Sequence, residues 1–159
     1  MTQFGKNLNK VILGAFRKLD KCNILYYILQ FTWGLIPNIF GLLSTLVLII
    51  FKKKPHKFYR SHYIKVGKLW GGMSLGISTF VDNYPSKHIL AHEYGHSFQN
   101  AILGPFWIFL VAIPSFIRYW IFEIRRKKGK KNPLYDSIWF EYNATSIGEM
   151  IMRRYEKSS

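Results

Sequence analysis

The stretch KHILAHEYGHSFQNAIL occupies residues 87–103 and carries the pentad His92-Glu93-Tyr94-Gly95-His96 at its centre. Residues four apart share one face of a helix, so a helix here brings the imidazoles of His92 and His96 to one metal ion. Glu93 lies beside that face, where a carboxylate can take a proton from a metal-bound water. The spacing therefore predicts a helix that carries a catalytic zinc site, with Zn²⁺ as the cofactor and Glu93 as the general base.

A catalytic zinc site also needs a third protein ligand, and the chain offers two candidates. Residues 97–104 contain no histidine, so a third His does not follow the second at short range. Glu141 is the favoured candidate, because it lies beside aromatic residues on a helix expected over 134–155, and buried acids are usually paired or metal-bound. Asp136, in the sequence Asn-Pro-Leu-Tyr-Asp, is the alternative.

Small residues favour close packing between these two helices. Ala144 stands three residues after Glu141 and therefore on the same helix face. Gly95 and Gly148 cost helix stability relative to alanine, about 1 kcal/mol each, so a packing role is a reasonable explanation for both. We expect the two helices to approach closely enough for the Glu141 carboxylate to reach the metal.

The segments flanking the 87–103 helix have recognisable ends and edges. Ser86 can cap its first turn, and Gly104-Pro105 is typical of a helix end. Residues 69–81, LWGGMSLGISTFV, combine glycines, β-branched residues and partial alternation, which predicts a short strand or hairpin beside the helix. The strand around 74–79 could align a peptide by edge pairing.

Composition favours a membrane as the partner. The chain has 159 residues, of which 49% are hydrophobic and 18% aromatic, yet its formal net charge is +15. The cations gather beside apolar runs, at 52–54 and 125–128. This pattern suits an anionic lipid bilayer. Nucleic acid is not an expected partner, because no nucleic-acid-binding motif is present.

Long apolar runs give the expected domain organisation. Residues 1–23 form a basic amphipathic lead-in, which lies either at the membrane surface or against the domain. Residues 24–51 carry no charge and, as a straight helix, would reach about 42 Å, but Pro37 predicts a kinked span or a re-entrant hairpin. Residues 105–124 form a second apolar segment, which contains Arg118.

The expected fold is therefore mainly α, a single membrane-associated helical domain over 1–159 with a short strand or hairpin beside the HExxH helix. A re-entrant first segment would keep every basic stretch on the cytoplasmic side. We accordingly expect a protein of the cell membrane whose site faces the cytoplasm.

A family resemblance rests on HEYGH followed by Glu141 and Ala144 in a Glu-x-x-Ala element. This combination resembles the gluzincin metallopeptidases, including membrane-embedded ones such as the CAAX prenyl proteases and their bacterial heat-shock relatives. A wider set of motifs is similar to small bacterial integral-membrane HEYGH proteins: Trp33, Pro37, Asn38, Gly41 and Leu42, then Ser-Leu-Gly at 74–76, Gly104-Pro105 and the Trp-Phe-Glu-x-x-Ala block at 139–144. The resemblance implies a zinc metallopeptidase that acts on peptides or membrane proteins, with His92, His96 and Glu141 as zinc ligands.

Two questions stay open at this stage. Many gluzincins have Asp directly after the Ala, whereas this chain has Thr145, a weaker orienting group, so a weakly active or inactive zinc-binding protein, scaffold or chaperone-like, is the alternative function. The donor that would stabilise a tetrahedral intermediate has three candidates, Tyr142, Tyr135 and His88.

Overall fold

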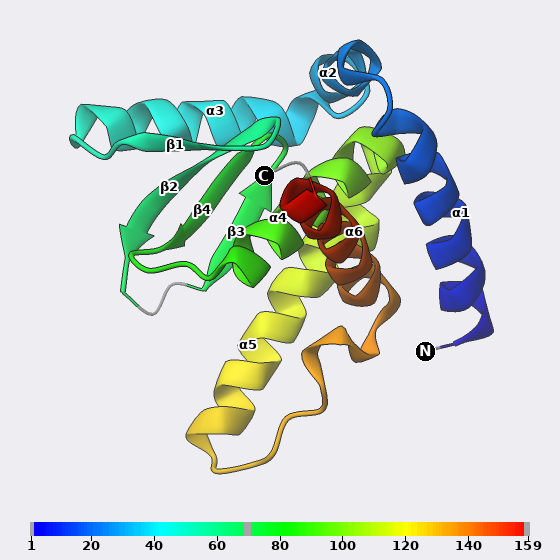
Figure 1. Cartoon of the computed structure of the whole chain (residues 1–159). Helices are drawn as coiled ribbons and strands as arrows, with labels where there is room; N and C mark the ends of the chain where they lie inside the picture. The colour runs from blue at the N-terminus through cyan, green and yellow to red at the C-terminus, as the bar shows by residue number, and fades with distance from the viewer. Residues whose placement is uncertain (1, 69–70, 158–159) are drawn as a thin grey trace.

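The computed structural model describes residues 2–68 and 71–157, without the side chains of 155–157. Figure 1 shows a small sheet beside a helical body, with the helix of residues 35–50 running along the sheet and the helix of residues 113–127 extending downward. The helices are α1 (Gln3–Leu19), α2 (Asn23–Phe31), α3 (Leu35–Ile50), α4 (Lys87–Leu103), α5 (Ile113–Lys127) and α6 (Trp139–Lys157), with a π-helical turn η1 (Ile108–Ala112) and a 3₁₀ turn η2 (Tyr135–Ser137). The strands are β1 (Pro55–Phe58), β2 (Ser61–Gly67), β3 (Gly72–Leu75) and β4 (Ser78–Asp82). The prediction of a mainly α fold is confirmed.

Helix α4, which carries the HExxH pentad, is the central element. Every residue from Leu90 to Ala101 is buried, as expected of a helix covered on all sides. The ends are those predicted: the Ser86 hydroxyl accepts a hydrogen bond from the backbone N–H of Ile89, and Gly104 is the C-cap, with φ 56°. The motif therefore sits in the core of the protein.

The hydrophobic core is built around α4 by α1, α2 and α6. Its largest buried members include Phe16, Tyr26, Tyr94 and Phe98, and the rings of Phe16 and Phe98 meet edge to face. Because Phe16 and its apolar neighbours on α1 are buried here, the apolar face of the N-terminal segment packs against the domain.

The four strands form one mixed sheet in the order β1-β2-β4-β3. Strands β2 and β4 are parallel, and the other two pairs are antiparallel. The hairpin expected within 69–81 corresponds to β3 and all of β4 except Asp82, and its residues 69–70 lie outside the described part of the chain. Strands β1 and β2 were not predicted, because residues 52–68 are basic and only β2 contributes buried side chains.

The apolar segment 24–51 is not one helix. Helices α2 and α3 are separated at residues 32–34 and bent by 88°, and Pro37 stands in the first turn of α3 rather than at the bend. A proline is tolerated there because the first N–H groups of a helix have no intrahelical acceptor. Within residues 2–68 and 71–157 no single helix has the length and apolarity to cross a membrane, and only this bent pair passes when taken together.

The C-terminal part of the fold closes over one side of α4. The second apolar segment becomes η1 followed by α5, and α6 then packs along α4. Helix α6 begins at Trp139, later than the predicted 134, because Ile138 is extended and residues 135–137 form the separate turn η2. This turn places Tyr135 against Arg118 and Phe122 of α5, beside the site described below.

Candidate metal centre

Three buried side chains converge where α4 crosses α6. Nε2 of His92 lies 3.1 Å from Oε2 of Glu141, and Nε2 of His96 lies 3.3 Å from the same oxygen. The potential ligand atoms of the three residues all lie within 4.8 Å of one another. This buried His-His-Glu group could hold a metal ion.

Backbone contact between α4 and α6 sets this geometry. A methyl group at Gly95 would collide with the backbone of Ala144, and one at Gly148 would lie 2.6 Å from the carbonyl oxygen of Ala91. Real Cβ atoms do not approach other atoms so closely, and thus both glycines are required by the close approach of the helices. The predicted packing of small residues is confirmed.

Each histidine is oriented by a second hydrogen bond at Nδ1. For His92 the partner is the hydroxyl of Thr145, at 2.8 Å, and for His96 it is Oε1 of Gln99, also at 2.8 Å. The Gln99 oxygen can only accept, so Nδ1 of His96 carries the hydrogen and Nε2 is the atom available to a metal. Such partners fix the tautomer and ring orientation of ligand histidines.

Gln99 is itself held by a buried chain of amides that sequence reasoning missed. Its Nε2 donates to the carbonyl of Phe140 at 2.8 Å and to Oδ1 of Asn143 at 2.9 Å. Nδ2 of Asn143 donates in turn to Oδ1 of Asn9 in α1, at 2.7 Å. The chain links α1, α6 and α4, which explains why these amides are buried. The available sequence signal was the spacing of three between His96 and Gln99.

Ser115 of α5 was also missed, and it contacts the candidate ligand directly. Its hydroxyl donates to Oε1 of Glu141 at 2.6 Å, whereas the histidines face Oε2. This division leaves Oε2 as the oxygen that faces a metal. Ser115 lies in an apolar helix far from the motif in sequence, so nothing local marked it.

The ionisation of the group follows from its burial and its mutual charges. Burial raises the pKa of Glu141, but hydrogen bonds from His92 and His96 and the charge of His96 outweigh it and hold that pKa well below its ordinary value. Burial lowers the pKa of His96, whereas the hydrogen bond and charge of Glu141 raise it, with a net result of about 9. The metal-free site is thus a buried ion pair.

Glu93 is arranged differently from the three converging residues. It is buried, and burial raises its pKa above the ordinary value although the nearby histidines oppose this. Gly72 of β3 lies directly against it, and a Cβ at that position would come within 2.8 Å of Cγ of Glu93. A carboxylate with a raised pKa is suited to accept and return a proton near neutral pH.

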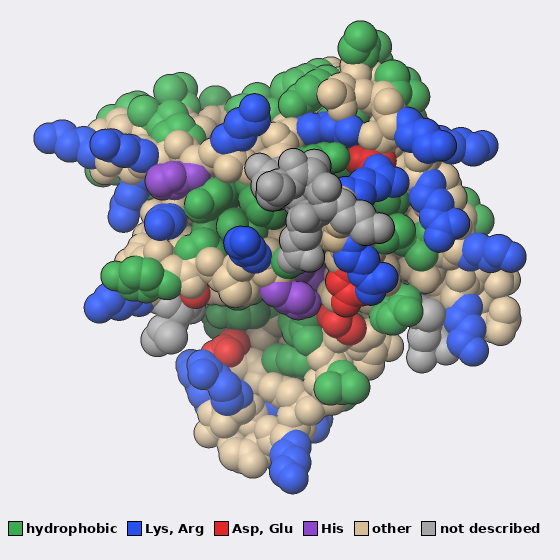
Figure 2. Space-filling model, in the orientation of Figure 1, with side chains coloured by type: hydrophobic (Ala, Val, Ile, Leu, Met, Phe, Trp, Pro, Cys, Tyr) green, Lys and Arg blue, Asp and Glu red, His purple; other side chains and the backbone are tan. Residues whose placement is uncertain are grey.

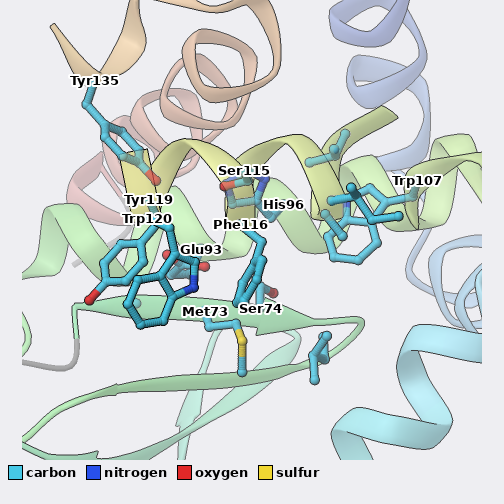
Figure 3. Close-up of a pocket in the computed structure, with 15 residues that line it drawn as sticks. Met73, Ser74, Glu93, His96, Trp107, Ser115, Phe116, Tyr119, Trp120 and Tyr135 are labelled. Atoms are coloured by element: carbon cyan, nitrogen blue, oxygen red, sulfur yellow. The ribbon is translucent and has the colours of Figure 1, made fainter. Parts of the chain in front are cut away.

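Glu93 and His96 form part of the wall of an apolar cleft of about 560 Å³ between β3 and α5. Figure 3 shows Phe116, Tyr119 and Trp120 of α5 on one side and Met73 and Ser74 of β3 on the other. The size is that of a small-molecule or peptide side-chain pocket. The cleft gives Glu93 and His96 access to a ligand.

Of the proposed oxyanion donors, only Tyr135 lines this cleft within the described chain. Tyr142 and His88 are not among the residues that line it. The ring of Tyr135 lies 6.0 Å from that of His92, and Nη2 of Arg118 donates to the carbonyl of Tyr135 at 2.9 Å. Partial burial and the charge of Glu141 raise the pKa of Tyr135, although the residue is 41% exposed, so the hydroxyl keeps its proton.

Asp136, the alternative third ligand, lies in η2 and is not among the residues that converge with His92 and His96 in the described chain.

Comparisons of the chain with protein-family models, curated proteins and solved structures found no match.

Proposed function

We propose that this protein is a zinc-dependent metallopeptidase. The proposal rests mainly on one arrangement: a buried His92-His96-Glu141 group that adjoins an apolar cleft, with Glu93 beside it at raised pKa. Two imidazoles and one carboxylate are the ligand set typical of catalytic zinc in peptidases.

The residues around the group have separable roles in this proposal. Zinc bound there would lower the pKa of a water ligand and polarise a substrate carbonyl. Glu93 would accept the proton from such a water and return it to the leaving amine. The Tyr135 hydroxyl donates a hydrogen bond to the oxygen that becomes negative in the transition state.

The edge strand β3 supports a peptide as the substrate. It is the last strand of the sheet, and its residues 72–75 line the cleft opposite α5. An extended peptide can pair with such an edge, while its apolar side chains enter the cleft. Phe116 and Trp120 favour a large apolar side chain there.

A second function is kept because of Thr145. A neutral hydroxyl orients His92 where a carboxylate would increase its basicity more, and this favours a zinc-binding protein of weak or absent activity, scaffold or chaperone-like.

Metal analysis and one conservative variant test the proposal. The full-length protein should bind about one zinc per chain, and His92→Ala should lose it, whereas His88→Ala, an exposed histidine of the same helix, should not. Glu93→Gln should keep the zinc and lose cleavage of a quenched-fluorescent peptide library rich in aromatic residues. Zinc binding without any cleavage by the wild type supports the second function, and cleavage that survives Glu93→Gln contradicts the proposed mechanism.

A further inference from the structure

We propose that helices α2 and α3 form a one-sided membrane anchor, which inserts into a single leaflet of an anionic bilayer and does not cross it. This inference rests on residues outside the metal group and stands whether or not the protein is a peptidase.

The polarity of α3 is reversed relative to a helix of a water-soluble core. Its buried residues, apart from Pro37, are polar or small: Asn38, Gly41 and Thr45. The side facing away from the protein is apolar, with exposed residues that include Leu35, Ile36, Ile39, Phe40, Leu42, Leu43, Leu46, Val47, Ile49 and Ile50. Helices surrounded by lipid show this pattern, with small and polar residues facing the protein and apolar residues facing outward.

Helix α2 repeats the pattern. It buries Tyr26 and Gln30, while Ile24, Leu25 and Ile28 are exposed. Exposed apolar surface on this scale marks an interaction site. Figure 2 shows hydrophobic side chains gathered along the upper rim of the molecule, over α2 and α3.

Hydrogen bonds to the protein body hold the bend between the two helices. Nδ2 of Asn38 donates to the carbonyl of Gln30 at 2.8 Å, and Nδ2 of Asn100 in α4 donates to the carbonyl of Gly34 at 3.1 Å. Oδ1 of Asn38 also accepts from the backbone N–H of Ile77 at 2.8 Å, which ties α3 to the β3–β4 turn. Straightening the pair would leave these buried groups unpaired, at a high energetic cost.

The length of α3 also argues against a full membrane span. Helix α3 has 16 residues and spans about 24 Å, less than the hydrocarbon core of about 30 Å. With the bend of 88° fixed, α2 cannot extend it across the bilayer. The pair can therefore lie within one leaflet, and its two ends return to the same side.

The positive charge beside α3 indicates that the lipid is anionic. Lys52, Lys53 and Lys54 directly follow α3 and are exposed, which places them at the headgroups when α3 is inserted. The net charge of +15 adds long-range attraction. Each lysine near an anionic surface strengthens binding, so acidic phospholipids are the expected occupant rather than a neutral bilayer or a second, equally basic copy.

Cysteine labelling tests the one-sided topology. The single cysteine, Cys22, is exposed and is first replaced in a Cys22→Ser background. Lys10→Cys precedes the anchor, Lys57→Cys follows it, and both positions are exposed. In intact spheroplasts and inverted vesicles, a membrane-impermeant maleimide should label both from the same side. Labelling of the two positions from opposite sides overturns the proposal.

Vesicle flotation tests the surface and the lipid. Phe40→Glu and Leu43→Glu, at outward positions of α3, should each weaken binding to phosphatidylcholine vesicles containing phosphatidylglycerol at least about tenfold. Val11→Glu, an equally exposed apolar site on α1, is the matched control and should bind normally. Replacing Lys52–Lys54 with glutamine should reduce the preference for vesicles containing phosphatidylglycerol over pure phosphatidylcholine vesicles about tenfold or more.

An unchanged circular dichroism spectrum and an unchanged thermal midpoint in each variant show that the chain still folds. The proposal is overturned if the protein is a monomer that stays in solution without detergent. It is also overturned if the protein forms a dimer through α3 and does not bind vesicles. Lost flotation in Val11→Glu overturns the assignment of the surface to α3.

Discussion

The hydroxyl of Thr145 lies 2.8 Å from Nδ1 of His92 and takes the place next to that ring where a carboxylate would bind more strongly. With Nε2 on a metal ion, Nδ1 would carry the hydrogen and donate it to the Thr145 hydroxyl. Thr145→Ala should weaken zinc affinity by about tenfold, whereas Thr145→Ser should not, and Thr145→Asp should raise the affinity. Competition with a chromogenic zinc chelator measures all three. Equal affinities across the series would show that the hydroxyl orients nothing.

The identity of the third ligand can be decided by paired variants. Glu141→Ala removes the only carboxylate that converges with His92 and His96 in the described residues, so zinc should fall far below one per chain. Asp136→Ala, in η2, should retain full occupancy. Metal content after dialysis is the measurement, and the reverse result would make Asp136 the ligand.

Tyr135→Phe tests the proposed transition-state donor. It removes the hydroxyl and keeps the ring that packs beside His92 and Phe122. We expect kcat to fall about 100-fold, with KM and zinc content nearly unchanged, because the hydrogen bond strengthens only as the oxyanion forms. Tyr142→Phe, outside the cleft, is the control. A fall in zinc content instead would assign Tyr135 a structural role.

Zinc binding should depend on pH through His96. In the metal-free protein the pKa of His96 is about 9, because Glu141 outweighs the opposing effect of burial. Below that pH the metal must displace a proton, so affinity should rise up to about pH 9 and then level off. Calorimetry in buffers of different ionisation enthalpy counts the released proton. No release near neutral pH would contradict the buried ion pair.

The same ion pair affects the stability of the metal-free protein. A folded-state pKa of about 9 means that the His96 contribution is complete below the ordinary histidine pKa and is lost as the pH rises through about 9. The pKa of Glu141 is lowered, so its contribution is present above the ordinary glutamate pKa and is lost in acid. Denaturant midpoints of metal-free protein should therefore be highest between those two ordinary values.

Helix contact makes Gly148 intolerant of a side chain. The added methyl of Gly148→Ala would lie 2.6 Å from the carbonyl of Ala91, and we expect the resulting strain to outweigh the gain in helix propensity, with a net loss of about 1–2 kcal/mol. At Gly14 in α1 nothing lies within 4 Å of such a methyl, so Gly14→Ala should stabilise the protein by about 0.5–1 kcal/mol. Chemical denaturation compares the two, and a stable Gly148→Ala would refute the packing.

Local sequence signals were sufficient to predict α4 from its spacing, its ends from their capping residues, and the approach of Glu141 from its aromatic and small neighbours. They were insufficient for Asn143 and Ser115, whose partners Gln99 and Glu141 are distant in sequence. Gln99 lies only three residues after His96, but the amides that hold it in place come from α6 and α1. The bend between α2 and α3 was expected at Pro37, but it forms earlier, where Gly34 allows the Asn100 side chain to approach. Strand β1 was missed because its exposed, basic residues give no hydrophobic alternation.

The direct backbone contact between Gly95 and Ala144 limits which metal ions the site can accept, because it sets the distance between α4 and α6. Side chains that separate two helices can yield by rotating, but two backbones in direct contact cannot, so the distance between α4 and α6 at the site is nearly invariant. An ion that prefers bonds of about 2.0–2.2 Å suits a gap of fixed width, whereas one that needs about 2.3–2.6 Å and more oxygens does not. Selection among metals would then come from two residues that never touch one.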